Sequence, residues 1–457
     1  MDRRTYLKAL GAAGVAGLAG CATFDPDGDE TPEPGPGPKP TETETATATA
    51  TPTETPRTPT EQIPHTGRFE NVVDLAEAGA DTEGNESVVD LLEDNLTDDT
   101  LVYLPPGRYL VDRTMRAKSF VNLGIVGKEA TIVPEPGFGS VFFDLGRPGQ
   151  ASDLLFEDVT FDFREPGVGS RPVSALVDDG LVVRNLFVTG RQDVGQGMLR
   201  ADVTDADGTG LVENLQIPDG AVYETSSNGV LVGDNHTGTI RFENCRVEGF
   251  PDNGLYADPQ HGSVEVVGGY YANSNIANVR IGNDSVVRDV HVRCDAAPDQ
   301  FSNMRGIRIT HGDGAVVEDC TVEMRRVAGS DGGITFGKGC ESATVKDTRI
   351  RVDADNVNAV QIKHPEGVAG DERIELDSLK ITGAAASSSA VEVHQRRDCT
   401  FKNLTIKQSG DDRDGFLIDR STAAIRDCWV EVTGQPIVTM GDSTTHVVDS
   451  YPPDLNS

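Results

Sequence analysis

A short pattern that recurs eleven times between residues 156 and 430 constrains the fold of this chain more than any other feature. It reads apolar, polar, Asn or Asp, two further residues, apolar, and nine of the eleven third positions are Asn or Asp. Successive copies lie 21 to 31 residues apart. The third positions are Asp158, Asn185, Asn214, Asn244, Gly268, Asp289, Asp319, Asp347, Ser378, Asn403 and Asp427. Such a period indicates a repeat architecture, in which each unit buries its apolar face against its neighbours.

Half a repeat away lies a second pattern, in which two apolar residues bracket one other residue. The pairs are Val230/Val232, Leu255/Ala257, Val279/Ile281, Ile307/Ile309, Ile334/Phe336, Val360/Ile362, Val391/Val393 and Phe416/Ile418. This alternation is typical of a strand with one buried face, and the Gly, Ala or Asn before most pairs suits a tight turn. We therefore predict an all-β, single-domain, right-handed parallel β-helix of about eleven or twelve coils, with the Asn/Asp column at a turn.

The start of the repeat region carries further motifs. Residues 87–95 have their apolar side chains on one side and predict a short helix that caps the open, edge-exposing end of the rod. Gly79-Ala80-Asp81 and Pro105-Pro106-Gly107-Arg108-Tyr109 resemble the opening of the pectate-lyase-like superfamily of β-helix proteins. The resemblance covers about residues 67–450 and implies a fold. It does not imply one function, because that superfamily holds lyases, hydrolases, esterases and non-catalytic tailspike-like proteins.

The N-terminal residues are predicted to direct export. Residues 3–8 are typical of a twin-arginine signal, and residues 18–21 of a lipoprotein cleavage box that would leave Cys21 as the acylated N-terminus. Residues 22–66, rich in Thr, Pro and Glu, predict a disordered linker. The β-helix would then occupy residues 67–457, with its cap and first strand over 67–110. We expect a lipid-anchored monomer on the extracellular face of the cytoplasmic membrane.

Composition narrows the choice of partners. The chain holds 40 Lys and Arg against 74 Asp and Glu, a net charge of −34. This argues against a nucleic-acid partner, which needs a basic face, and resembles the surfaces of proteins from high-salt environments. The six cysteines after Cys21 show no spacing typical of a metal site, and we expect them to be small buried residues of the core.

The residues between the bracketing pairs predict one outward-facing column. They are Leu231, Tyr256, Arg280, Arg308, Thr335, Gln361, Glu392 and Leu417. With residues just beyond the strands they would form a locally basic stripe, although ordinary half-exposed strand positions are polar too. On the functional interpretation the stripe binds a polysaccharide, and an anionic one is the leading candidate. The predicted substrate-binding residues are Tyr256, Arg280, Gln361, Lys363, His364, Glu392 and His394.

If the protein is an enzyme, the leading reaction is eliminative cleavage beside a uronate carboxylate. Such a reaction needs a cation to neutralise the carboxylate and a base for the neighbouring proton, and Arg308, His311 and Lys338 offer both. Asp258 and Asp284 could hold Ca²⁺ through oxygen ligands. A non-catalytic surface rod that binds glycans remains the alternative. A glycoside hydrolase is less favoured, because no suitably placed pair of carboxylates is evident in the strand pattern.

Overall fold

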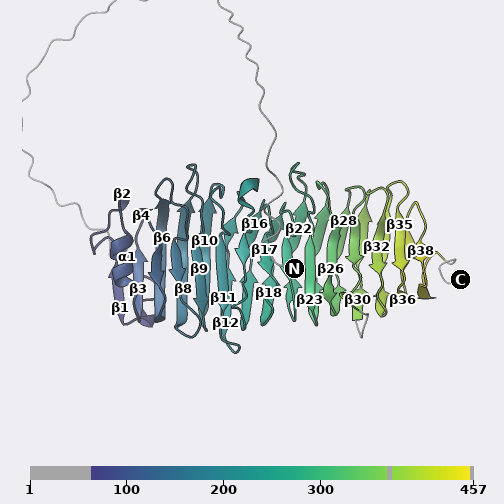
Figure 1. Ribbon diagram of the computed structural model, residues 1–457, viewed down its shortest axis with the longest axis horizontal. Helices are drawn as coiled ribbons and strands as arrows, with labels where there is room; N and C mark the ends of the chain where they lie inside the picture. Colours follow the sequence, from purple (N-terminus) through teal and green to yellow (C-terminus); the bar gives the residue numbers. More distant parts are fainter. Residues whose placement is uncertain (1–62, 368–372, 453–457) are drawn as a thin grey trace, which may run out of the picture. The chain divides into compact units, whose positions relative to one another are not determined.

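The computed structural model describes residues 63–367 and 373–452, and in these ranges nearly all regular structure is parallel strand. Residues 62–457 cluster as one compact unit. Figure 1 shows the strands stacked side by side along one axis, as the repeat pattern predicted. The predicted all-β parallel β-helix is therefore confirmed. The predicted export signal, Cys21 and residues 22–62 of the predicted linker lie outside the described residues.

Thirteen strands, one from each coil, form the first sheet (sheet 1). They are β5 (Met115–Ala117), β7 (Phe143–Leu145), β9 (Val173–Val177), β11 (Leu199–Val203), β14 (Val230–Leu231), β17 (Leu255–Ala257), β20 (Val279–Ile281), β23 (Ile307–Gly312), β26 (Gly332–Cys340), β29 (Asn358–Ile362), β32 (Ser389–His394), β35 (Asp414–Asp419) and β38 (Ile437–Met440). The rod thus has slightly more coils than the eleven or twelve expected.

The second sheet (sheet 2) has 26 strands and holds the rest of each coil as two short strands, or as one long strand. The strands that come first in each coil are β1 (Asn71–Asp74), β3 (Thr100–Leu104), β6 (Phe120–Pro134), β8 (Ala151–Asp162), β10 (Leu181–Thr189), β12 (Thr209–Glu213), β15 (Thr239–Glu243), β18 (Ser263–Val267), β21 (Val286–Arg288), β24 (Ala315–Glu318), β27 (Ser342–Lys346), β30 (Arg373–Asp377), β33 (Cys399–Lys402), β36 (Thr422–Arg426) and β39 (Thr444–Val448). The second strands are β2 (Glu83–Ser87), β4 (Gly107–Val111), β13 (Gln216–Ile217), β16 (Arg246–Glu248), β19 (Tyr270–Ala272), β22 (His291–Cys294), β25 (Thr321–Met324), β28 (Arg349–Val352), β31 (Lys380–Gly383), β34 (Thr405–Gln408) and β37 (Trp429–Glu431).

The predicted Asn/Asp column lies at the bend between the two halves of sheet 2. All eleven positions have a left-handed backbone, with φ between 50° and 64°. Asn, Asp and Gly tolerate this conformation better than other residues, which explains the composition of the column. Some of the side chains also bond from coil to coil: Asn185 Nδ2 donates to Asp158 Oδ1, and Asn214 Nδ2 donates to Asn185 Oδ1, both at 2.7 Å. The turn prediction is confirmed.

The interior is a continuous apolar core that runs through the coils. The residue three positions after each column position is buried, from Phe161 to Val430. The six cysteines of the described residues are buried, as expected. Burial raises the pKa of the Cys245 and Cys294 thiols to about 12, so these thiols stay neutral inside the core.

The N-terminal end of the rod is covered by α1 (Val89–Asn95), which confirms the predicted cap (Figure 1). Its Val89 and Leu92 are buried in the core cluster. Asp81 accepts hydrogen bonds from the backbone N–H groups of the next turn, and these bonds lower the pKa of its carboxyl. The buried Tyr109 donates from its hydroxyl to Pro105 O at 2.6 Å. No helix in the described part of the chain is long and apolar enough to cross a membrane.

Residues 63–69 (the strap) pack on the outer face of sheet 2 instead of joining the core, and they include the one-turn helix η1 (Thr66–Arg68). The ring of Phe69 fits into a notch at Gly124, where a Cβ atom would lie 2.6 Å from Phe69 Cζ. Ile63 packs against the same apolar cluster. His65 Nε2 lies 3.2 Å from Glu157 Oε2. A second one-turn helix, η2 (Tyr223–Thr225), lies in the loop before β14.

Candidate site on the outer face of sheet 1

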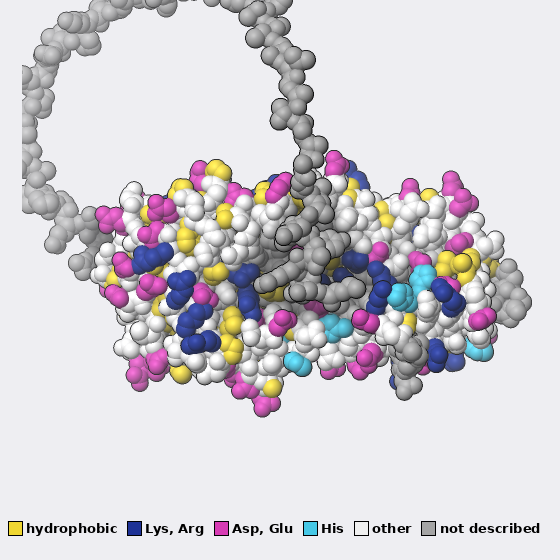
Figure 2. All heavy atoms as spheres, viewed as in Figure 1, with side chains coloured by type: hydrophobic (Ala, Val, Ile, Leu, Met, Phe, Trp, Pro, Cys, Tyr) yellow, Lys and Arg dark blue, Asp and Glu magenta, His cyan; other side chains and the backbone are white. Residues whose placement is uncertain are grey.

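The outward column predicted from the sequence forms one unbroken row across sheet 1. Each member pairs in parallel register with the next, from Leu231 through Glu392 to Leu417. Arg200 extends the row toward the N-terminal end. Figure 2 shows Lys and Arg side chains in a broken row along the rod, with His side chains beside them.

Most cations of this row are paired with acidic side chains. Arg280 Nε lies 2.7 Å from Asp258 Oδ2, and its guanidinium also lies 4.1 Å from the ring centroid of Tyr256. Arg200 forms the same kind of pair with Asp202, at 2.7 Å. Beside the row, Lys363 Nζ lies 2.5 Å from an Asp331 oxygen. These cations are therefore already neutralised within the protein.

Arg308 differs from its neighbours. It is the one arginine of the row, within residues 63–367 and 373–452, that makes no hydrogen bond or ion pair. The nearby Arg305 forms an ion pair with Asp331. Burial lowers the pKa of the Arg308 guanidinium to about 10, and the positive charges of Arg305 and Arg280 add to this effect. The group stays charged at neutral pH, so an unpaired cation lies on the face.

Three side-chain oxygens without a hydrogen-bond partner lie on the coil of Arg308 and on the next two coils. Thr310 Oγ1, Thr335 Oγ1 and Gln361 Oε1 have no hydrogen-bond partner. Arg308 and Thr310 belong to β23, and Thr335 and Gln361 follow Arg308 in register on β26 and β29. Polar groups shielded from solvent are nearly always hydrogen-bonded, so these three oxygens are unsatisfied exceptions within the row. We call Arg308, Thr310, Thr335 and Gln361 the open cluster.

His311 is held beside the open cluster by a contact that fixes its tautomer. Its Nε2 lies 3.2 Å from the backbone oxygen of Asp258, two coils away. A carbonyl oxygen only accepts, so Nε2 carries a proton in this contact, and Nδ1 is the ring nitrogen left to accept one. The ring reaches this far because it passes over Gly282, where a Cβ atom would lie 2.9 Å from His311 Cε1. His311 is therefore placed as a hydrogen-bond acceptor or base.

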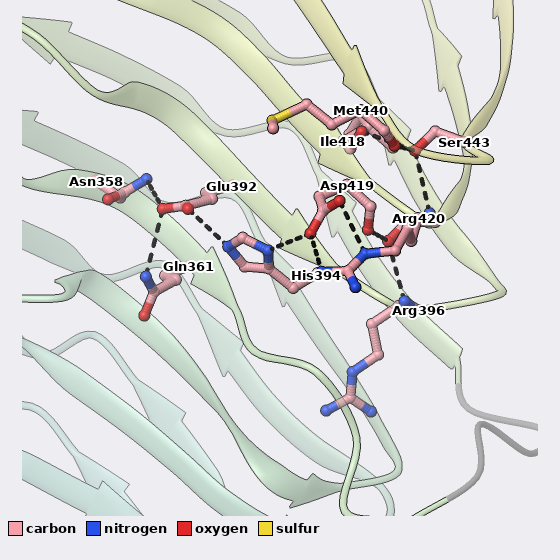
Figure 3. A network of polar contacts seen from close by, with 11 residues as sticks. Asn358, Gln361, Glu392, His394, Arg396, Ile418, Asp419, Arg420, Met440 and Ser443 are labelled. Carbon is pink, nitrogen blue, oxygen red and sulfur yellow. Dashed lines mark hydrogen bonds and ion pairs between the residues drawn. The ribbon is translucent and has the colours of Figure 1, made fainter.

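On the C-terminal side of the open cluster, His394 lies between two carboxylates (Figure 3). Its Nε2 is 2.7 Å from Glu392 Oε1, and its Nδ1 is 3.1 Å from Asp419 Oδ2. The bond to Glu392 is the main cause that raises the pKa of His394, and the same bond lowers the pKa of Glu392. Glu392 also accepts from Asn358 Nδ2 at 2.7 Å. Two predicted substrate-binding residues, Glu392 and His394, thus bind each other.

The remaining predicted residues are less constrained. Lys338 is exposed, and no partner of its side chain is seen in the described part of the chain. His364 Nδ1 lies 3.1 Å from the adjacent Pro365 O. Asp331, which pairs with Lys363, was missed by the strand pattern because it lies in the turn before β26.

The two aspartates predicted as Ca²⁺ ligands contact other side chains in the structure. Asp258 is occupied by Arg280, whereas Asp284 is an exposed turn residue that accepts from Asn283 Nδ2 at 3.0 Å. Among the described residues, no group of three or more His, Cys, Asp or Glu side chains is arranged to hold a metal ion. Bound Ca²⁺ would need most of its oxygens from elsewhere, since this ion takes six to eight.

The solved structures that match this chain resemble it only distantly. No protein-family model and no curated protein sequence matches the chain. The A-module of a mannuronan C-5 epimerase from Azotobacter vinelandii aligns with a TM-score of 0.49 at 14% identity, over 83% of this chain and 99% of that one. A surface adhesin of Streptococcus pneumoniae aligns with a TM-score of 0.47 at 13% identity, over 80% and 93%. A GH87 alpha-1,3-glucanase from Streptomyces thermodiastaticus gives 0.44 at 14%, over 82% and 68%. Similarities this weak say nothing about the activity of this chain.

Proposed function

We propose that sheet 1 binds an anionic, uronate-containing polysaccharide, with one sugar carboxylate at Arg308. The open cluster is the observation that carries this proposal, because it combines an unpaired guanidinium with three oxygens that lack partners. A uronate supplies what these groups lack. Its carboxylate accepts two parallel bonds from a guanidinium, and its hydroxyls can bond to Thr and Gln side chains.

The charge pairs on either side of the open cluster fit the same function. The Arg280–Asp258 pair and the His394 network are internally satisfied, so they hold the face in shape without attracting a carboxylate themselves. The net charge of −34 repels a polyanion at long range. We therefore expect binding to strengthen from low to moderate salt, as this repulsion is screened, and to weaken at high salt as the contact with Arg308 is screened too.

The test is equilibrium binding of uronate hexamers to the Arg308→Gln variant. The loss of a charge-assisted contact of about 1.5–3 kcal/mol predicts a Kd that is about 10- to 150-fold weaker. Arg351→Gln is the matched control, because Arg351 is exposed on sheet 2 and paired with Asp353, and its loss changes the net charge equally. Equal affinities of the two variants would exclude the proposed role of Arg308.

A second candidate function, eliminative cleavage, is favoured by the tautomer of His311. With Nε2–H held by Asp258 O, Nδ1 can take the proton from the carbon beside the bound carboxylate. The electron pair left on that carbon forms a carbon–carbon double bond. The glycosidic oxygen departs with its bonding electrons and takes a proton from solvent. Arg308 would neutralise the carboxylate of the reacting sugar, and Lys338 would pair with the carboxylate of the next sugar.

Product masses distinguish this reaction from its alternatives. An elimination yields chains with an unsaturated end that are lighter by one water than hydrolysis products. His311→Gln should stop cleavage and leave hexamer binding within about threefold of wild type. If the wild-type protein retains the polysaccharide without cleaving it, the protein is a binder, and the first proposal stands without the second. Products with water added would make it a hydrolase.

We also propose that the protein works outside the cell, exported by the twin-arginine route and held to the cytoplasmic membrane by a lipid on Cys21. The residue order at positions 3–8 and 18–21 supports this. Cys21→Ser should release the protein into the medium, or leave it unprocessed, whereas Arg3→Lys with Arg4→Lys should retain it inside. A Cys21→Ser variant that stays membrane-bound in mature form would exclude the anchor.

A further inference from the structure

A second polar site lies on sheet 2, away from the open cluster. A hollow of about 290 Å³ is lined by Asp319, Asp347, Thr348, Arg349, Ser378 and Lys380. Arg349 and Lys380 begin β28 and β31 and pair in parallel register, so they are neighbours on adjacent coils. Asp319 and Asp347 occupy the left-handed turn column beside them.

The four charged side chains of this hollow are not used by the protein. Within the described ranges, Asp319, Asp347, Arg349 and Lys380 make no side-chain hydrogen bond or ion pair with one another or with other residues. Elsewhere on sheet 2 such neighbours do pair: Arg246 lies 2.5 Å from Glu248, and His291 lies 3.0 Å from Glu323. Opposite charges that share a hollow and stay apart are available to a ligand that carries both acidic and hydroxyl groups.

The surface around the hollow is unusual for so acidic a chain. One of the two outward columns of the second strands contains no Asp or Glu between Arg108 and Tyr451, whereas the other includes Glu248 and Glu323. Two coils beyond Lys380, the column presents Trp429 stacked on Tyr451 with ring centroids 4.1 Å apart. Both rings are more than 40% exposed. Exposed aromatic rings of this kind are enriched at binding surfaces.

We infer that this hollow binds one acidic sugar residue of a polysaccharide, as a second contact site on the rod. Arg349 and Lys380 would take the sugar carboxylate, and Asp319 and Asp347 would accept hydrogen bonds from ring hydroxyls. The choice of an acidic sugar as ligand rests on the proposed function. The unpaired charges of the hollow are an independent observation, since they lie on a different sheet from Arg308.

The experiment is calorimetric titration of the full chain with uronate hexamers, and with neutral glucose hexamers as the reference ligand. Wild type should bind two uronate hexamers per protein. Arg349→Gln combined with Lys380→Gln should remove one of them and leave the site at Arg308 intact. Asp319→Asn combined with Asp347→Asn should weaken the same site about tenfold, since Asn suits the turn but no longer offers a charged acceptor. Arg351→Gln, on the same strand as Arg349, should change nothing.

The outcomes separate the two sites. A stoichiometry of one that Arg308→Gln abolishes, with no effect of the hollow variants, would overturn this inference and leave the proposed function standing. If Arg308→Gln has no effect but the hollow variants abolish binding, the hollow is supported and the proposed site on sheet 1 falls. Equal binding of neutral hexamers at the hollow would overturn its assignment to an acidic sugar.

Discussion

Replacement of Asn185 by Ala tests whether the turn column stabilises the rod through its side chains, its backbone, or both. Asn185 has φ 51° and bonds in both directions along the column. Its Nδ2 donates to Asp158 Oδ1, and its Oδ1 accepts from Asn214 Nδ2. Alanine removes both bonds and places an ordinary residue in the left-handed region. Glycine removes the same two bonds but fits that backbone without strain.

The two variants should therefore differ in a defined way. Two hydrogen bonds at about 1 kcal/mol each predict that Asn185→Gly lowers the free energy of unfolding by about 2 kcal/mol, plus a fraction for added chain freedom. Asn185→Ala should cost about 3–4 kcal/mol, because a left-handed alanine adds about 1–2 kcal/mol.

Denaturant unfolding followed by far-ultraviolet circular dichroism measures both values. Because repeat proteins can unfold in parts, the m-values must agree between variants before the free energies are compared. The expected order of stability is wild type, then glycine, then alanine. Equal stability of the two variants would refute the backbone argument, and an alanine variant within 0.5 kcal/mol of wild type, the usual scatter of surface substitutions, would refute the whole account.

Three further predictions concern pH, the position of His311 and the strap. The raised pKa of His394 means that its stabilising contribution is complete below about pH 6.5 and is lost as pH rises through the folded-state pKa. The free energy of unfolding should therefore fall from pH 6 to 9 in wild type and change less in His394→Gln. Identical pH profiles of the two proteins would contradict this. Gly282→Ala should displace the His311 ring and lower any cleavage rate at least tenfold without weakening hexamer binding to the same degree; unchanged kinetics would show that the contact is unimportant. Gly124→Ala should expel Phe69 from its notch and expose the strap to proteolysis, while the melting temperature of the coils shifts little; a strap as resistant as wild type would count against the notch.

The repeat pattern predicted the fold and the outward column because both follow from local periodicity. Alternation of period two places Arg280 and Arg308 on the same face, and the spacing of the copies places them on adjacent coils. The first coils were undercounted because they do not carry Asn or Asp at the turn. Glu129 takes the left-handed position in one of them, which the pattern could not anticipate.

The candidate site was less predictable because its charge pairing depends on irregular segments. In the sequence Arg280 and Arg308 are equivalent, yet in the described structure Arg280 forms an ion pair with Asp258, whereas Arg308 forms none and feels its acidic neighbours only at longer range. The difference arises in the turns, where Asp331 binds Arg305 and Lys363 and is thereby unavailable to Arg308. Turn lengths vary from coil to coil, so sequence spacing gives no register for such contacts.

The strap has a mechanical consequence. The chain enters the described fold on the flank of sheet 2, through the few residues that end at Phe69, before it reaches the first strand. A pull transmitted along the preceding residues therefore loads this flank contact first, and the stacked coils only afterwards. Detaching the strap breaks its apolar contacts, the His65–Glu157 contact and the hydrogen bonds between Arg68 and Asn122, which are fewer interactions than join two coils through a ladder of backbone hydrogen bonds. The strap can thus detach before any coil separates, and the stacked coils then keep their shape.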